Sequence, residues 1–304
     1  MKRFGLITFF VVTLLVACSP KISEIEEYQR AAKAGEKGAI KKLLKLLEYP
    51  DEEIKVKAYS GLIEAPKDKK EFIEDKLIAM LKEKSDDATK EFVVGLLGKL
   101  KSKKAVPVLK ELGKDKTFRR RYVVFSAFGE IQDESVVEDV IEALSDPLED
   151  VRKYASRALI KLGPKAIPKM MEKMPQSNDA VKGYLIRAFG ELRNNQPEDL
   201  LIKEIEGANK LDVIWALGKL GKEKSLPVLL NLTKSPDYKV RIQACQALGD
   251  LNLKEAIPVL KTALNDKEVL VREWAARSLE LLTGERTLYR DEKGKLALPY
   301  NIYH

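Results

Sequence analysis

Few side chains in this chain of 304 residues are of a type that could carry out chemistry near neutral pH. There are two cysteines, Cys18 and Cys245, and one histidine, His304. A single histidine at the last position argues against general-base catalysis and against a histidine-based metal site. The many carboxylates fall on the solvent positions of amphipathic patterns, and no Gly-rich phosphate loop is present. We therefore expect no catalytic residue, cofactor or metal, and no enzyme activity.

The surroundings of Cys18 give its thiol a different use. Lys2 and Arg3 precede an apolar run at 4–16, which is too short for a membrane-spanning helix of about 20 residues and fits a secretory signal. The run ends in Leu-Val-Ala-Cys, which resembles a bacterial lipobox. That resemblance implies that residues 1–17 are a signal peptide that is removed. It also implies that Cys18 carries palmitate-type acyl chains, two or more of which anchor a protein stably in a membrane.

An exported, acylated chain implies a location in the bacterial cell envelope, with the folded part facing the periplasm or the exterior. Ser19 to Ser23 form only a short tether, so that folded part is expected close to the membrane. Ser19 is not the Asp that marks retention in the inner membrane in some lipoproteins, which favours the outer membrane without deciding between the two. Cys245 would then be the remaining thiol, with no disulfide partner, and its small apolar neighbours predict a buried side chain.

The rest of the chain reads as helices arranged in repeats. Segments such as AFGEL and ALGDL recur with centres at 98, 129, 160, 190, 218, 249 and 280, in steps of 28 to 31 residues. A second, independent series places a proline at the start of a helix in the same register: Pro107, Pro168, Pro227 and Pro258. Glycine recurs at five of the centres although it costs roughly 1 kcal/mol in a helix. We expect neighbouring helices to approach too closely there for a side chain.

The pattern VRxxAxxALGxL followed by AIPxL is similar to HEAT repeats of the short, phycobilisome-lyase-like type. The resemblance implies an all-α fold, a right-handed α-solenoid of about eight HEAT-like helix pairs over residues 38–284. Residues 18–37 would comprise the lipidated cysteine, the tether and an N-terminal cap helix from Ile22 to Ala34. Residues 285–304 abandon the repeat, and we expect a strand-less tail packed on the last helix pair or, alternatively, a docking segment.

A basic residue recurs near the start of the second helix in six repeats, and Asp recurs before it. The resemblance implies that these residues form a structural Asp–Arg ladder between loops and helices, so we interpret the basic row as mainly architectural. The basic residues are Arg121, Arg152, Lys182, Lys210, Arg241 and Arg272, and the acidic ones are Asp115, Asp146 and Asp266.

Aromatic and arginine side chains three residues apart share a helix face in several repeats. They are Tyr154 and Arg157, Tyr184 and Arg187, and Trp274 and Arg277, with Trp215 in the arginine register. Aromatic and Arg side chains are enriched in binding hot spots, and solenoids bind partners on an extended concave surface. These seven residues could form a binding stripe on the concave face, or they could wedge adjacent repeats together.

The sequence therefore predicts a membrane-anchored, non-enzymatic scaffold that binds a protein or peptide in the cell envelope. The net charge of +8 becomes +6 without Lys2 and Arg3. This mild excess leaves open an alternative, a module that grips anionic lipid or cell-wall polymer through basic helices. Export argues against nucleic acid as a partner. The identity of the partner and the oligomeric state stay open.

Overall fold

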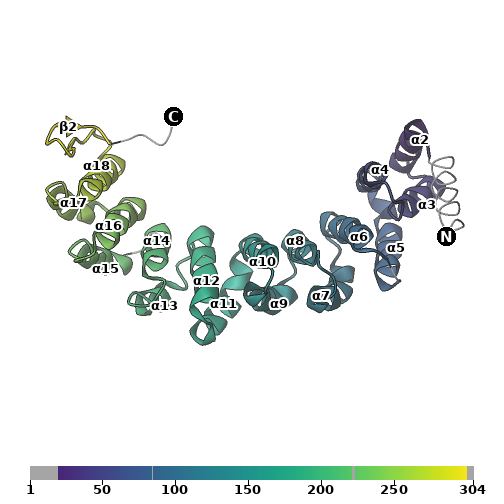
Figure 1. Cartoon of the computed structure of the whole chain (residues 1–304), viewed down its shortest axis with the longest axis horizontal. Coiled ribbons are helices and arrows are strands. Elements are labelled where there is room, and N and C mark those ends of the chain that lie inside the picture. The colour runs from purple at the N-terminus through teal and green to yellow at the C-terminus, as the bar shows by residue number, and fades with distance from the viewer. Residues whose placement is uncertain (1–19, 84, 221–222, 300–304) are drawn as a thin grey trace, which may run out of the picture. The chain divides into compact units, whose positions relative to one another are not determined.

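The structure is a computed structural model that describes residues 20–83, 85–220 and 223–299. Cys18 and His304 lie outside these residues. The described chain divides into two compact units, with unit 1 ending at Asp133 and unit 2 beginning at Glu134. Each unit is built of helices that follow one another in antiparallel pairs, and Figure 1 labels them in chain order.

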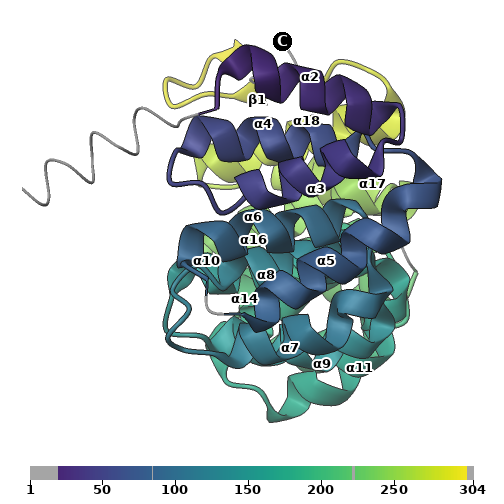
Figure 2. The same ribbon diagram turned by 90° about the vertical axis from the view of Figure 1, so that its right-hand side faces the viewer.

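Unit 1 contains three helix pairs preceded by one extra helix. The pairs are α3–α4, α5–α6 and α7–α8, and the extra helix α2 packs on both α3 and α4, as Figure 2 shows. This is the position of the expected N-terminal cap. The elements are α2 (Ile22–Lys33), α3 (Lys37–Leu46), α4 (Glu52–Ile63), the 3-10 turn η1 (Lys67–Lys69), α5 (Lys70–Lys82), α6 (Asp87–Lys99), η2 (Lys103–Ala105), α7 (Val106–Lys114) and α8 (Tyr122–Ile131).

Unit 2 contains five helix pairs and a small hairpin. Its helices are α9 (Val137–Glu142), α10 (Glu149–Leu162), α11 (Ile167–Lys173), α12 (Asp179–Leu192), α13 (Glu198–Lys203), α14 (Lys210–Leu220), α15 (Ser225–Leu232), α16 (Tyr238–Leu251), α17 (Ile257–Ala263) and α18 (Val269–Thr283). Short 3-10 turns flank several of them: η3 (Glu134–Val136), η4 (Ala143–Ser145), η5 (Gly163–Ala166), η6 (Met174–Gln176) and η7 (Lys254–Ala256). Together the described residues of both units hold eight pairs, so the predicted all-α solenoid is confirmed.

Each unit has two layers of helices. We call the first helices of the pairs the A layer and the second helices the B layer; α2 joins the B layer of unit 1. In unit 2 the B layer is α10, α12, α14, α16 and α18, each packed on the next, and the A-layer helices pack behind them. The B layer lies on the inner side of the bend of unit 2, which is the concave face on which a binding stripe was expected (Figure 1).

Local sequence signals explain where the helices begin. The side chains of Asp51, Asp86 and Asn178 accept hydrogen bonds from backbone N–H groups two or three residues on, which satisfies donors that the first turn leaves free. The prolines of the AIP-type segments occupy the first turn of α7, α11 and α17, where a missing N–H costs nothing.

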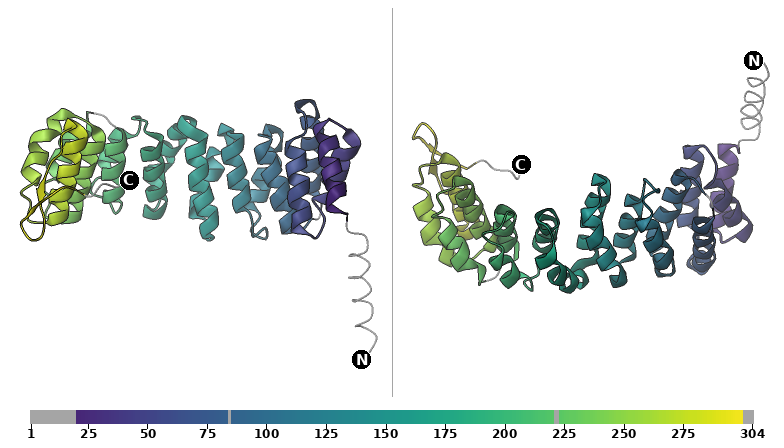
Figure 3. Two further views of the ribbon diagram at one scale, coloured as in Figure 1. Left: turned by 90° about the horizontal axis from the view of Figure 1, so that it is seen from above. Right: turned by 60° about the horizontal axis from the view of Figure 1, so that its bottom comes forward.

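The chain after α18 differs from the expectation of a strand-less tail. Strands β1 (Tyr289–Arg290) and β2 (Leu296–Ala297) form an antiparallel hairpin, the yellow element at the end of unit 2 in Figure 3, and β1 packs on α18. Asp291 fixes the turn, because its Oδ1 accepts from the N–H groups of Lys293 and Lys295, both at 2.8 Å. Gly294 adopts the left-handed φ of +74° that the turn needs. The expectation of packing on the last helix pair is confirmed.

Candidate binding surface

The glycines of the repeat bring the B-layer helices close together, as the sequence predicts. A Cβ on Gly218 would lie 2.7 Å from Cα of Ala247, and one on Gly249 would lie 2.6 Å from Oγ of Ser278. In unit 1 the same relationship joins Gly98 and Ala127 at 3.0 Å. Since real Cβ contacts are longer, the helices could not pack this closely with any larger residue. The seam fixes the spacing of the side chains that the B layer presents.

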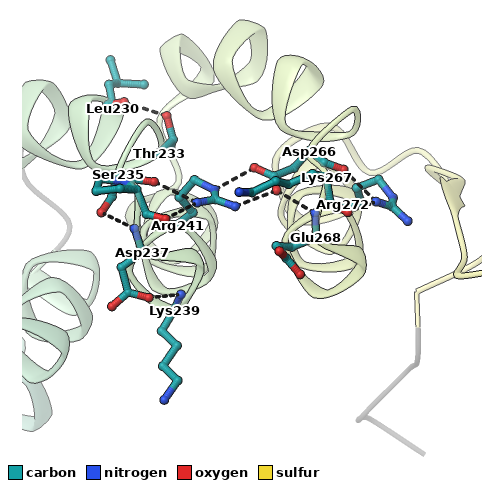
Figure 4. Close-up of polar contacts among 11 residues, drawn as sticks. Leu230, Thr233, Ser235, Asp237, Lys239, Arg241, Asp266, Lys267, Glu268 and Arg272 are labelled. Carbon is teal, nitrogen blue, oxygen red and sulfur yellow. Dashed lines mark hydrogen bonds and ion pairs between the residues drawn. The ribbon is translucent and has the colours of Figure 1, made fainter.

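The Asp–Arg ladder holds the same helices in register at their first turns. The guanidinium of Arg241 in α16 donates to both carboxylate oxygens of Asp266, through Nε at 2.8 Å and Nη2 at 2.9 Å. Its Nη1 donates to the carbonyl oxygens of Ser235 and Pro236, in the loop before its own helix, at 2.8 and 3.1 Å. One buried side chain thus ties a loop to the next repeat, as Figure 4 shows.

Other members of the basic row repeat parts of this arrangement. Arg152 Nη1 donates to the carbonyls of Asp146 and Pro147 at 2.7 and 3.0 Å. Lys182 Nζ lies 2.9 Å from both carboxylate oxygens of Glu204, across to the next pair. The architectural interpretation of the row is therefore supported by its contacts.

The ladder also extends to the first two helix pairs, α3–α4 and α5–α6, where the sequence pattern did not predict it. Lys55 occupies the row position of α4; its side chain is buried, donates to Oγ1 of Thr89 at 2.9 Å and lies 3.7 Å from Asp86. Burial raises the pKa of Asp86, but hydrogen bonds from Thr89 and the charge of Lys55 outweigh burial, so this pKa is lowered overall. The signal that could have found Lys55 is its place before an apolar stretch ending in Gly-Leu-Ile.

In the described residues no helix pair follows α18, which carries the last rung of the ladder. Arg272 Nη1 donates to the carbonyls of Asp266 and Lys267, just as Arg241 does in its own loop. Its Nε and Nη2 donate instead to the carbonyls of Arg290 and Asp291 in the hairpin, at 2.8 and 3.2 Å. The hairpin therefore takes the place of the missing next repeat.

Two rows of side chains run across the B layer of unit 2, one residue from each helix. The first row is Tyr154, Tyr184, Asp212, Gln243 and Trp274, and the second is Arg157, Arg187, Trp215, Gln246 and Arg277. Arg157 and Arg187 are exposed and the other eight are half-buried. We call these ten residues the B-layer stripe. It contains all seven residues predicted for a binding site.

The stripe contains cation–aromatic pairs within a helix and an ion pair between helices. The guanidinium of Arg157 lies 5.3 Å from the ring centre of Tyr154, and that of Arg277 lies 4.4 Å from the ring centre of Trp274. Arg187 does not pair with Tyr184 in this way; its Nε lies 3.1 Å from Oδ1 of Asp212 on the next helix. Asp212 was not predicted as a stripe residue. It lies at the position equivalent to Tyr184 only because this repeat is 28 residues long instead of 30 or 31.

Trp215 has a packing role that the sequence left as an alternative. The Cβ position of Gly190 in α12 is 2.3 Å from Cζ3 of Trp215, so the indole fills the space that this glycine leaves between α12 and α14. The ring remains half-buried rather than buried. Trp215 therefore wedges two repeats and also contributes an edge to the stripe.

The second cysteine has no place in this surface. Cys245 is buried in α16, and burial is the main cause that raises the pKa of its thiol to about 12. A thiol with so high a pKa is protonated near neutral pH and reacts poorly as a nucleophile. In the described part of the chain no three potential ligands from His, Cys, Asp and Glu come together for a metal ion, and no helix is long and apolar enough to cross a membrane.

Comparison with known proteins identifies the repeats. The family described as HEAT repeats matches residues 74–161 and 227–289. These two segments of the chain therefore carry HEAT repeats. Among curated proteins, no sequence matches it.

A solved structure with low sequence identity shares the solenoid fold, and two others match with lower TM-scores. A mutant of Kap121p is 15% identical, with a TM-score of 0.56, over 90% of this chain and 35% of that chain. The complex of CpcE and CpcF of phycocyanin lyase from a Nostoc species is 20% identical, with a TM-score of 0.37, over 68% and 86%. Human deoxyhypusine hydroxylase is 17% identical, with a TM-score of 0.35, over 82% and 97%.

Proposed function

We propose that the HEAT array is a non-enzymatic scaffold that binds a protein or peptide through the B-layer stripe of unit 2. The observation that carries this proposal is the presentation of aromatic and arginine side chains at equivalent positions of α10, α12 and α18, with Trp215 on α14 and with Arg157 and Arg187 exposed. An aromatic ring offers a large contact area at little cost in conformational entropy, and a guanidinium offers several hydrogen-bond donors. Such side chains dominate binding free energies when a partner excludes water from them.

The charges of the stripe suggest which side chains a partner would meet first. Arg187 is 68% exposed in spite of its ion pair with Asp212, which is itself 33% exposed. An exposed pair of this kind is worth at most about 1 kcal/mol, so a carboxylate of a partner can compete for the guanidinium. Arg277 is only 15% exposed and lies 3.9 Å from Glu273, so it supports Trp274 more than it faces solvent.

We further propose that this scaffold is a lipoprotein of the bacterial cell envelope, anchored by acyl chains on Cys18 and facing the periplasm or the exterior. The lipobox-like segment supports this proposal. The α2 helix begins at Ile22, four residues beyond Cys18. Because an extended residue spans at most about 3.6 Å, the first turn of α2 would lie within about 15 Å of the anchor.

The stripe is tested by exchanging its exposed charges and identifying crosslinked partners in cells. We expect Arg157→Glu with Arg187→Glu to remove the crosslinked species that wild type gives. A control that changes Lys254 and Lys261 to Glu carries the same charge change on the A-layer side of unit 2, where neither lysine has an ion pair among the described residues. Unchanged crosslinks in a folded stripe variant would reject the stripe as the binding site.

The anchor is tested separately by metabolic acyl labelling. Wild type should incorporate label and Cys18→Ala should not. Label in the Cys18→Ala protein, or none in wild type, would reject acylation at this residue without affecting the proposal for the stripe.

A further inference from the structure

The two units carry very different net charges. Residues 20–133 contain 26 Lys and Arg against 21 Asp and Glu, whereas residues 134–299 contain 27 against 26. Almost the whole basic excess of the described chain and its short gaps therefore belongs to unit 1. A surface that attracts an anionic partner is to be sought there and not on the stripe of unit 2.

Within unit 1 the helix α3, whose sequence is KGAIKKLLKL, carries lysines and no acidic residue. Its inward face is buried through Ala39, Ile40, Leu43 and Leu44. Its outward face presents four exposed lysines, Lys37, Lys41, Lys42 and Lys45. The helix contains no acidic residue, since Glu36 and Glu48 lie beyond its ends. We call these four residues the lysine face.

No carboxylate neutralises the lysine face among the described residues. Lys42 Nζ lies over the ring of Tyr28 at 4.2 Å and Lys37 Nζ over the ring of Phe72 at 4.8 Å. Neither they nor Lys41 and Lys45 form an ion pair in the described part of the chain. Neighbouring lysines behave differently, because Lys70 pairs with Glu74 and Lys104 pairs with Asp75.

The lysine face also lies near the start of the folded chain. The helices α2 and α3 are packed neighbours joined by the three residues 34–36, so they run antiparallel and the last turn of α3 lies beside the first turn of α2. Ile22, in that first turn, is 46% exposed. An apolar side chain next to unpaired lysines is the combination found in segments that lie on membrane surfaces.

We propose that the lysine face of α3 binds the anionic headgroups of a membrane and holds unit 1 against the bilayer, leaving the stripe of unit 2 to a protein partner. The part of this proposal that concerns orientation rests on the proposed acylation of Cys18, whereas the attraction to anionic lipid does not. A lysine near an anionic surface contributes about 1 kcal/mol, equivalent to about fivefold in partitioning.

The test uses the full chain bound to vesicles and a fluorophore on Gly38→Cys. Gly38 lies on the exposed side of α3, and an added Cβ there meets nothing within 4 Å. Energy transfer to a headgroup-labelled lipid then reports how close α3 is to the bilayer. A label on Asn231→Cys, exposed on α15 of unit 2, is the reference, and buried Cys245 should not label.

We expect transfer from Gly38→Cys to be higher on phosphatidylglycerol-containing vesicles than on phosphatidylcholine vesicles. Raising the salt from 0.1 to 1 M, which shortens the Debye length from about 10 to about 3 Å, should abolish the difference. Lys41→Gln with Lys45→Gln should lower the lipid-charge-dependent partitioning at least tenfold. The control Lys254→Gln with Lys261→Gln removes the same charge from unit 2 and should leave it unchanged.

Two results would overturn the proposal. The first is energy transfer from Gly38→Cys that does not depend on the charge of the lipid. The second is energy transfer that still depends on lipid charge in the Lys41→Gln, Lys45→Gln variant, when its circular dichroism spectrum is unchanged. Binding to an anionic cell-wall polymer without any response to anionic vesicles would likewise reject a lipid partner. If only the proposed acylation of Cys18 is wrong, the protein should not bind phosphatidylcholine vesicles but should still respond to phosphatidylglycerol. This result separates a failure of the anchor from a failure of the lysine face.

Discussion

Arg241 and Asp266 form a two-pronged ion pair between consecutive repeats, with only 7% and 14% of their side chains exposed. The guanidinium is planar and matches the carboxylate with two parallel hydrogen bonds. Its third nitrogen reaches the loop before its own helix, so the pair connects three segments of unit 2.

Arg241→Met should destabilise unit 2 by about 3 kcal/mol, because it leaves a largely buried carboxylate and two loop carbonyls without their donors. Urea unfolding followed by circular dichroism measures this loss. Arg187→Met removes the ion pair between Arg187 and Asp212, which is of similar length but more exposed. The loss of unfolding free energy should therefore stay below about 1 kcal/mol. Equal costs for the two variants would contradict a special role for the Arg241 rung.

Acid should weaken the ladder. Burial raises the pKa of Asp266, but the hydrogen bonds from Arg241 and the N–H of Glu268 outweigh burial and lower it overall. A carboxyl whose pKa is lower in the folded than in the unfolded chain adds stability above the unfolded pKa of about 3.9 and loses it as the pH falls. We expect the urea concentration at the unfolding midpoint to decrease when the pH falls below about 4. This decrease should be smaller in Asp266→Asn. A parallel decline in both proteins would show that other groups control acid unfolding.

High pH should also destabilise the fold, in this case through ionisation of Cys245. The thiol ionises near pH 8.5 when the chain is unfolded but has a pKa of about 12 in the folded protein. Stability from this group is therefore complete below pH 8.5 and is lost as the pH rises toward 12. The unfolding midpoint of wild type should fall more between pH 8 and 10 than that of Cys245→Ala. Rapid reaction of native Cys245 with a thiol reagent at pH 7 would contradict its burial.

Alanine in place of a seam glycine should separate two helices. Gly218→Ala places a methyl group 2.7 Å from the backbone of Ala247, and we expect a loss of about 1–2 kcal/mol in spite of the better helix propensity of alanine. Gly38→Ala is the matched control, since its methyl group meets nothing within 4 Å. That change should stabilise the protein by up to about 1 kcal/mol. Thermal or urea unfolding of both variants tests the sign of each effect.

The repeat itself could be predicted from the sequence because its recurring glycines lie where neighbouring helices approach closely. A glycine at a constant position inside a helix has a cost in every repeat, and close contact with Ala247 or Ser278 explains why it is kept at Gly218 and Gly249. The basic row was predictable for a similar reason, since three of its arginines, Arg152, Arg241 and Arg272, meet equivalent loop carbonyls. These contacts lie within a repeat or between adjacent repeats, so periodicity alone carries the information.

Features that break the repeat could not be predicted in this way. The hairpin forms through Asp291 and Gly294, which belong to no repeat. Lys55 was missed because the series of recurring segments begins at 98, after its repeat. The stripe was only partly predictable, since spacing places Trp215 and Arg187 in one register but does not show that the indole turns toward Gly190 or that the guanidinium turns toward Asp212.

The hairpin bonded to Arg272 has a consequence for how the array ends. Arg241 offers Nε and Nη2 to the repeat that follows it, and Arg272 presents the same two nitrogens on the last described helix pair of unit 2. If these donors were open, the first repeat of another molecule would bind there, and chains joined head to tail in this way would grow as fibres. Because the backbone carbonyls of Arg290 and Asp291 accept from Nε and Nη2 of Arg272, these donors are not available to a second molecule.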